Sequence, residues 1–145
     1  MLKIVIALAG LLALPAAAET YHVDALTGDD RADGLAPAQA WRSLARVNAV
    51  RLKPGDRVLL AAGSVWKEPL TITRSGRSSA PIAVATFGQG ARPRIDAGGV
   101  SPHAVGIIDA EYVTVEGLEV TNDTPNGAAG ADPRYGVLVS AQDRG

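Results

Sequence analysis

Short apolar runs with period-two alternation recur along the chain from Val58 to Val139. Val58 precedes Ile82 by 24 positions, Val113 precedes Val137 by the same interval, and neighbouring runs give intervals of 25 and 23. A recurring interval of roughly 20–50 residues is typical of solenoids, in which each turn of the chain covers the apolar interior of the previous turn. The sequence therefore predicts a stack of parallel strands with a coil of about 24 residues.

The same alternation predicts where the strands lie, with turn residues such as Gly, Pro, Asn and Asp between them. An antiparallel sandwich is the alternative fold, and it predicts evenly spaced strands without a fixed interval spanning two or three of them. The interval favours the parallel stack, with Gly117 as a sharp corner between two strands. The predicted strands are residues 21–24, 57–61, 69–73, 82–87, 94–96, 105–109, 113–116, 118–121 and 137–139.

One amphipathic helix is expected before the first coil. Pro37 is favourable at a helix start, and Trp41, Leu44 and Val47 recur every three residues. The pattern predicts a helix of about ten to fourteen residues that ends before the Pro54-Gly55 turn. Such a helix would cap the open end of the first coil, and this role is favoured over a ligand site around Trp41.

The first residues read as a secretory signal peptide. Lys3 is followed by an apolar segment over residues 4–14, Pro15 and the small residues Ala16-Ala17-Ala18. The segment is too short for a membrane span, which needs about 20 apolar residues. Cleavage after Ala18 and a secreted or periplasmic location are expected. The predicted domains are a signal peptide at 1–18, a strand with a capping helix at 19–56, and coils at 57–145 that stop without a closing cap.

Composition excludes several classes of protein. Without its leader the chain keeps 13 basic and 15 acidic residues, a net charge of −2, so neither nucleic acid nor an anionic membrane surface is an expected partner. The chain has no cysteine, which rules out a lipoprotein anchor and disulfides. Its aromatic content of 4% suits a narrow core of small and β-branched side chains.

Several motifs resemble the amino-terminal region of secreted bacterial right-handed parallel β-helix proteins of the pectate-lyase-like, polysaccharide lyase superfamily. They are Tyr-His-Val-Asp at 21–24, Gly-Asp-Asp at 28–30, Asp-Gly-Leu at 33–35, Pro37, Ala-Trp at 40–41, Leu-Lys-Pro-Gly-Asp-Arg-Val-Leu at 52–59, Ser-Ala-Pro-Ile at 79–82, Gly-Gln-Gly-Ala at 88–91 and Tyr-Val-Thr-Val-Glu-Gly-Leu-Glu-Val-Thr-Asn at 112–122. The resemblance covers essentially all of the chain after the leader.

This resemblance implies a right-handed parallel β-helix of which the chain holds about three coils. It also implies a longer protein of several hundred residues. Many members are polysaccharide lyases or glycoside hydrolases, and their catalytic sites lie on middle or later coils. No catalytic residue is therefore assigned in this chain. No cofactor is evident, and a calcium requirement would belong to the missing coils.

Few residues stand out as chemical groups. Uronate elimination needs a base and a cation that neutralises the sugar carboxylate. The residues that could supply these groups do not form a set with the spacing of a recognisable catalytic motif. They are Lys67, Arg74, Arg77, His103 and Glu111. An acidic group is read as solvated strand faces: Asp109, Glu111, Glu116 and Glu119. Zinc is not supported, because His22 and His103 lie far apart without ligand spacing.

Three further motifs have a structural reading and a functional one. Asp29, Arg31 and Asp33 sit at alternate positions of a calcium-like loop, but Arg31 and Ala40 occupy ligand positions, so a plain turn is favoured and no metal is assigned. Trp66 is a possible glycan contact, since an indole ring can stack on sugars, or else covers a coil edge. Asn122 is expected to bind backbone groups at a coil turn.

These observations favour an exported β-helix protein that acts on or binds polysaccharide, with a lyase of acidic polysaccharide as the preferred subtype. A non-catalytic adhesin or glycan-binding solenoid is the alternative, and a truncated product without independent activity is another. Three coils bury little apolar area, and the last run at 137–139 would leave an unpaired edge. The isolated chain is therefore expected to be marginally stable or to self-associate. The sequence does not decide the substrate or the oligomeric state.

Overall fold

The computed structural model describes residues 16–124 and 133–142, which form ten strands and two short helices. Within these residues, no helix combines the length and the apolar character that crossing a membrane requires. The strands are β1 (Thr20–Val23), β2 (Arg57–Ala61), β3 (Val65–Trp66), β4 (Leu70–Ile72), β5 (Ile82–Phe87), β6 (Arg94–Asp96), β7 (His103–Ile108), β8 (Val113–Val115), β9 (Glu119–Thr121) and β10 (Tyr135–Ser140). The helices are the 3₁₀ helix η1 (Pro37–Gln39) and α1 (Leu44–Ala49).

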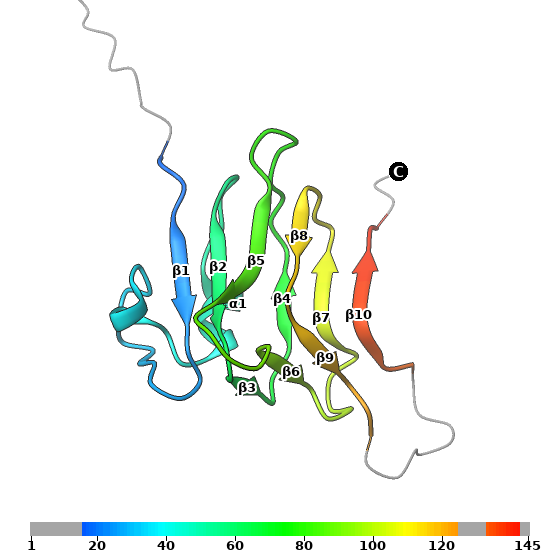
Figure 1. The fold of residues 1–145 in the computed structure, drawn as a ribbon. Coiled ribbons are helices and arrows are strands. Elements are labelled where there is room, and N and C mark those ends of the chain that lie inside the picture. The colour runs from blue at the N-terminus through cyan, green and yellow to red at the C-terminus, as the bar shows by residue number, and fades with distance from the viewer. Residues whose placement is uncertain (1–15, 125–132, 143–145) are drawn as a thin grey trace, which may run out of the picture.

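The strands form three parallel sheets, which are β1-β2-β5-β8, β3-β6-β9 and β4-β7-β10 (Figure 1). From β2 onward the chain enters the three sheets in fixed rotation, so that β2, β3 and β4 are followed by β5, β6 and β7, then by β8, β9 and β10. Every strand pairing in these sheets is parallel. The predicted parallel stacking is confirmed, and the antiparallel sandwich is wrong.

The core lies between the three sheets and consists of aligned columns of aliphatic side chains. Val58 of β2 pairs with Val84 of β5, and Leu70 of β4 pairs with Val105 of β7; all four are buried. These branched side chains suit the pleated surface of a strand and fill a narrow interior without large rings. The predicted inward positions from β2 to β6 are confirmed as core residues, whereas those of the later runs are partly buried or exposed. The confirmed positions are Val58, Leu60, Leu70, Ile72, Ile82, Val84 and Ile95.

The predicted coil length of about 24 residues is wrong. Paired residues are 26 positions apart at Val58 and Val84, but 35 positions apart at Leu70 and Val105. The 24-residue step from Val113 leads from β8 into β10, which belong to different sheets. Loops between strands vary in length because their backbone forms no hydrogen bonds within the sheets. The number of residues between successive apolar runs therefore differs from the number between residues that pair in neighbouring strands. The two-residue strand β3 was missed because it is too short to show alternation.

The predicted helix of ten to fourteen residues is also wrong. Pro37 opens only the three-residue η1, and the six-residue α1 starts after Ser43, whose hydroxyl accepts a hydrogen bond from the Arg46 N–H as an N-cap. Between the two helices the chain is extended, because the Trp41 N–H donates to the His22 carbonyl oxygen beside β1. Trp41 and Leu44 therefore do not share one helix face, because Trp41 lies in the extended segment beside β1 and Leu44 lies in α1.

The segment from β1 to α1 lies against the starting edge of all three sheets (Figure 1). β1 pairs with β2, and the indole Nε1 of Trp66 in β3 donates to the Arg42 carbonyl oxygen at 2.9 Å. In α1, the Asn48 side chain donates to the Pro69 carbonyl oxygen and accepts from the Thr71 N–H, at the start of β4. The helix is shorter than predicted, yet the segment occupies the position expected of a cap.

The opposite edge is formed by β8, β9 and β10, and it exposes residues of the interior columns. Val137 pairs with the buried Val105 but is 54% exposed, and Val139 is 68% exposed. Among the described residues, no strand pairs with the outer edge of β10. Apolar side chains that face the interior in earlier turns therefore face solvent in this one.

Candidate functional site

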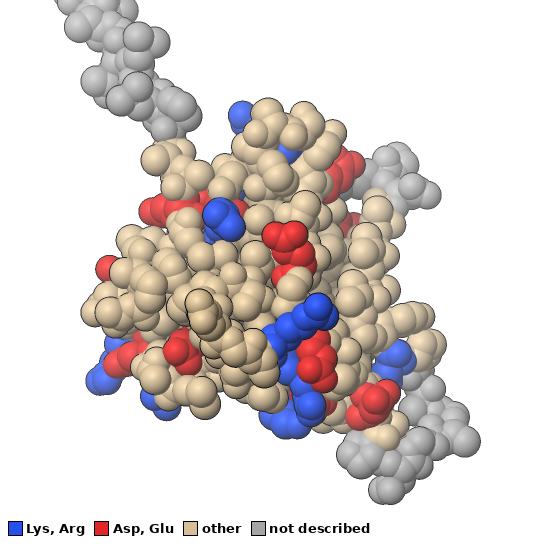
Figure 2. Space-filling view, in the orientation of Figure 1, with Lys and Arg blue, Asp and Glu red and all other residues tan. Residues whose placement is uncertain are grey.

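Charged side chains form a ladder on the outer face of the β3-β6-β9 sheet. Within β6, Ile95 points into the core while its neighbours Arg94 and Asp96 point outward. Arg94 pairs in register with Glu119 of β9, and Asp96 pairs with Thr121. Alternation along three short parallel strands thus brings polar side chains from three turns of the chain to one surface. Figure 2 shows basic and acidic side chains next to one another over this region.

Ion pairs connect the ladder. The Lys67 Nζ lies 2.5 Å from Asp96 Oδ2, and the Arg94 guanidinium lies 3.1 Å from the same oxygen. The second guanidinium nitrogen of Arg94 lies 3.7 Å from Glu119 Oε1. The other oxygen of Asp96 accepts a hydrogen bond from the Gly98 N–H. These contacts lower the pKa of Asp96 well below its usual range, first through the hydrogen bond from Lys67 and then through the one from Arg94.

A hollow of about 390 Å³ adjoins the ladder, between the ends of β6 and β9. It offers ammonium and guanidinium donors, carboxylate acceptors and hydroxyl groups close together, which suits a ligand rich in hydroxyl groups. Asp96 remains ionised at neutral pH and so cannot serve as a general acid there. The paired cations and carboxylates of the hollow therefore suit it to binding. Its lining residues are Lys67, Arg94, Asp96, Gly98, Thr121, Asp123 and Thr124.

Replacing Asp96 by asparagine is expected to lower stability at neutral pH, because Lys67 and Arg94 lose their shared carboxylate. The folded-state pKa of Asp96 is depressed, so its stabilising contribution is present above the unfolded value of about 3.9 and is lost as the pH falls through the folded value. The difference in melting temperature between wild type and Asp96→Asn should be constant above about pH 5 and shrink below it.

Glu116→Gln is the matched control for this measurement, because Glu116 is exposed and forms no ion pair with another described residue. Its effect on the melting temperature should be small at every pH. A difference for Asp96→Asn that persists unchanged to pH 2 would show that the ion pairs do not provide the stabilisation.

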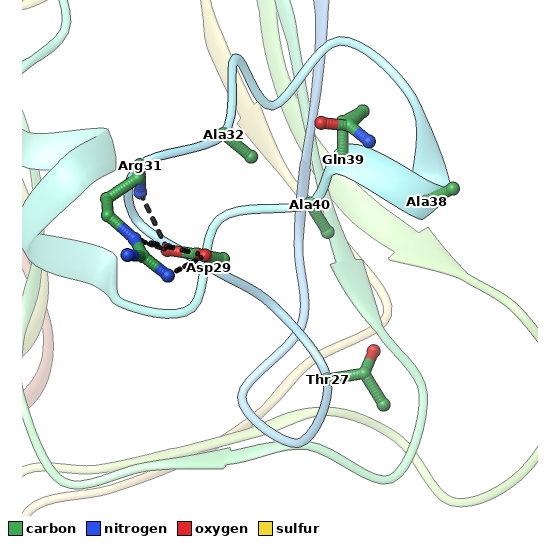
Figure 3. Close-up of a pocket in the computed structure, with 7 residues that line it drawn as sticks. All are labelled: Thr27, Asp29, Arg31, Ala32, Ala38, Gln39 and Ala40. Atoms are coloured by element: carbon green, nitrogen blue, oxygen red, sulfur yellow. Dashed lines mark hydrogen bonds and ion pairs between the residues drawn. The ribbon is translucent and has the colours of Figure 1, made fainter.

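A second hollow, of about 510 Å³, lies in the loops between β1 and α1 (Figure 3). Figure 3 shows the Arg31 guanidinium facing the Asp29 carboxylate, and the closest of their contacts is 2.8 Å. Hydrogen bonds from Arg31 lower the pKa of Asp29 to about 2. The Asp33 carboxylate accepts from the Leu35 N–H. These carboxylates of the calcium-like motif are engaged in local turn hydrogen bonds, as the turn interpretation expects.

The two tryptophans lie in the interior. Trp66 is 3% exposed, and its indole N–H donates to the Arg42 carbonyl oxygen. The glycan contact at Trp66 stays a prediction, and its burial favours the alternative that Trp66 covers a coil edge. Trp41 stacks on Tyr21 with ring centroids 4.8 Å apart, and its Nε1 donates to the Ala32 carbonyl oxygen. It is a core residue, in agreement with the favoured interpretation.

The other residues singled out by sequence are dispersed. His103 Nε2 lies 2.9 Å from Thr71 Oγ1 on the β4-β7-β10 sheet, whereas the charged ladder belongs to the β3-β6-β9 sheet. The Glu111 N–H donates to Ser75 Oγ in a loop, and the Asp109 carboxylate accepts from the Gln142 N–H. Of the two candidate sets, only Lys67 and Glu119 reach the ladder. Among the described residues, no group of three or more His, Cys, Asp or Glu side chains is arranged to hold a metal ion.

Two structural expectations are confirmed. Gly117 has φ 75° at the corner between β8 and β9, a conformation that favours glycine. The buried Asn122 side chain accepts from the Gly99 N–H and donates to the carbonyl oxygens of Ser101 and Tyr135.

Sequence reasoning missed Arg94 and Asp96 as site residues. The Arg-Ile-Asp run was read only for its apolar centre, although alternation places its two charged residues on one face. Their meeting with Lys67 depends on the register between β3 and β6, which no local pattern carries.

Lacto-N-biosidases are among the known proteins that the chain resembles. The curated relative, from Bifidobacterium longum subsp. longum, is 31% identical over 72% of the chain. A solved GH136 lacto-N-biosidase from Eubacterium ramulus matches with a TM-score of 0.76 and 32% identity over 83% of the chain; its native crystal form gives 0.70 and 34% over 79%. The chain is homologous to these carbohydrate-active proteins. No protein-family model matches the chain.

The homologues are much longer than this chain. The chain spans 8% of the curated relative, and 24% and 22% of the two solved chains. A rhamnogalacturonan lyase also matches, with a TM-score of 0.54 and 21% identity over 69% of the chain and 28% of the lyase. At that identity the likeness concerns the fold alone.

Proposed function

We propose that the chain forms the first coils of an exported right-handed parallel β-helix protein that acts on glycans. The observation that carries the proposal is the homology to lacto-N-biosidases over most of the chain. The fixed rotation of strands through three parallel sheets supports the β-helix. The leader-like residues 1–18 support export, with cleavage after Ala18 and delivery to the periplasm or the medium.

Within this proposal, a glycosidase is favoured over the lyase that the sequence alone suggested. The relatives above 30% identity are named lacto-N-biosidases, whereas the lyase match is 21% identical. The charged ladder also argues against an acidic polysaccharide, since Lys67 and Arg94 already pair with Asp96 and Glu119. A polyanion would have to displace these carboxylates, whereas a neutral glycan would use them as acceptors.

The described coils contribute a scaffold and a binding surface in this proposal. Glycosidases need a carboxyl group that stays protonated near neutral pH, which requires a raised pKa. Asp96, by contrast, is held ionised by two cations. A non-catalytic glycan-binding solenoid is the second candidate function, and the ion-paired state of Asp96 at the hollow is the observation that favours it.

The test uses the exported protein with two substrates, p-nitrophenyl β-lacto-N-bioside and polygalacturonate. Release of p-nitrophenol is expected, without formation of unsaturated uronate products. Binding of lacto-N-biose without hydrolysis would favour the second candidate. Uronate elimination would overturn the glycosidase, and neither binding nor turnover would overturn both candidates.

The hollow itself is tested by Thr121→Val, which removes one hydroxyl from its lining at nearly constant volume. We expect affinity for lacto-N-biose, measured by isothermal titration calorimetry, to fall about two- to tenfold, because one hydrogen bond contributes about 0.5–1.5 kcal/mol. Thr114→Val, on the exposed side of β8, is the matched control and should leave affinity unchanged. Equal effects of the two substitutions would place glycan binding elsewhere.

A further inference from the structure

Asp56 is a fully buried carboxylate in the turn before β2, with 0% exposure. Its Oδ1 accepts a hydrogen bond from the Glu19 N–H at 2.8 Å, and its Oδ2 accepts one from the Lys53 N–H at 2.8 Å. Among the described residues, no cation forms an ion pair with Asp56, because the Lys53 Nζ binds the Glu19 carboxylate instead. Its negative charge is therefore compensated by backbone donors.

Such a group is unusual, since a buried charge is costly unless it is paired with an opposite charge. The nitrogen that donates to Asp56 Oδ1 belongs to Glu19, the residue that follows the Ala16-Ala17-Ala18 motif. Ala18 is exposed, and Thr20, the first residue of β1 that pairs with β2, follows directly after Glu19. The cleavage motif and the buried carboxylate are independent observations that meet at one nitrogen atom.

We propose that Asp56 is the receptor for the α-ammonium group that leader cleavage creates at Glu19. The inference rests on the proposed export of the protein and is independent of its glycan activity. Cleavage hydrolyses the bond between the Ala18 carbonyl carbon and the Glu19 nitrogen. The hydroxyl of water goes to the Ala18 carbon, and the carboxylic acid that forms loses its proton to become a carboxylate. The Glu19 nitrogen gains that proton and the second proton of the water, and so becomes an ammonium group.

Cleavage would change the chemical nature of the contact between the Glu19 nitrogen and Asp56 without moving either group. A neutral amide donor becomes a cation next to a buried anion, and charge-assisted hydrogen bonds are stronger than neutral ones. The Arg57 N–H already donates to the Glu19 carbonyl oxygen at 2.8 Å, so Glu19 would be held on both sides. Processing would thereby fix β1 on the edge of β2. The other charged or titratable groups facing this site are the Glu19 carboxylate, the Lys53 ammonium, the Tyr21 hydroxyl and Arg57.

The chain offers a clean chemical readout. After cleavage, trypsin releases residues 19–31, a peptide without lysine, so its α-amine is its only amino group. The amino terminus of the exported protein would first be determined by N-terminal sequencing. The protein would then be acetylated with limiting reagent across a range of pH, once in the folded state and once in denaturant. Mass spectrometry of this peptide gives the rate at the α-amine. Reference peptides have an α-amino pKa of about 7.7–8.0.

We expect an amino terminus at Glu19 and acetylation at neutral pH at least about tenfold slower in the folded protein. The rate should also rise at a higher pH than it does for the free 19–31 peptide, because an ion pair favours the ammonium form. Burial without an ion pair shifts the curve to lower pH, so the wild type alone separates the two explanations. Asp56→Asn should remove most of the protection, whereas Asp33→Asn, at an exposed turn, should not.

Two results would overturn the inference in different ways. An amino terminus elsewhere would remove both the cleavage site after Ala18 and the role of Asp56. An amino terminus at Glu19 with equal acetylation in the folded and denatured states, or with a curve shifted to lower pH, would remove the role of Asp56 alone. Neither result bears on the glycan assays.

Discussion

Ile95→Ala is expected to destabilise the protein by about 2–5 kcal/mol, which is the cost of truncating a large side chain in a well-packed core. Ile95 is 0% exposed in the central strand β6, where it pairs with Trp66 on one side and Val120 on the other. The residual cavity would thus interrupt a column shared by three turns of the chain. Urea unfolding followed by the fluorescence of the two buried tryptophans, Trp41 and Trp66, provides the measurement.

Val100→Ala is the matched control, because Val100 is an 88% exposed aliphatic residue in the loop after β6. Its effect should stay within about 0.5 kcal/mol. Similar losses for the two substitutions would contradict the placement of Ile95 in the core. A complete loss of folding in Ile95→Ala alone would agree with it, since a small domain has little stability in reserve.

Asn122→Ala is the second change with a large expected effect. The buried Asn122 amide joins three backbone groups, at Gly99, Ser101 and Tyr135, and so connects the loop after β6 to the start of β10. Each buried group left without a partner costs about 1–3 kcal/mol, so the free energy of unfolding should fall by several kcal/mol. Thermal unfolding and hydrogen exchange of the Gly99 amide would measure the loss.

Asn48→Ala serves as the comparison, because Asn48 makes similar backbone hydrogen bonds to Pro69 and Thr71 at an exposed position. Water replaces the lost partners there, so a cost of only about 0.5–1.5 kcal/mol is expected. If Asn48→Ala proved the more damaging of the two, the buried bridge at Asn122 would not be a principal link between turns.

Much of the fold was predictable because strand alternation is a local signal. The inward positions of β2, β4 and β5 followed from apolar residues two apart, and the parallel stack followed from the recurrence of such runs. The capping segment was predicted in place but not in form. Its apolar spacing at Trp41, Leu44 and Val47 fits a helix, but the hydrogen bond of Trp41 to β1 overrides that local preference.

The candidate site was far less predictable. The sequence indicates Lys67 and Glu119 as charged candidates, but it assigns no role to Arg94 or Asp96 and leaves Trp66 between a glycan contact and the cover of a coil edge. Burial of Trp66 depends on the capping segment, whose Arg42 carbonyl accepts its indole N–H. Contacts of this kind join residues 24 or more positions apart and leave no periodic trace in the chain.

By itself, the sequence determined the strand positions and the small aliphatic core, because each depends on residues close together in the chain. The recurrence of similar apolar runs indicated the parallel stacking. Only the tertiary structure decided the register, and with it which charges meet. Turns of unequal length separate Val58 from Val84 by 26 residues and Leu70 from Val105 by 35, so no fixed interval could align the partners. The ladder around Asp96 and the contact between Asp56 and Glu19 both arise from pairing between distant strands, which is settled by packing in three dimensions.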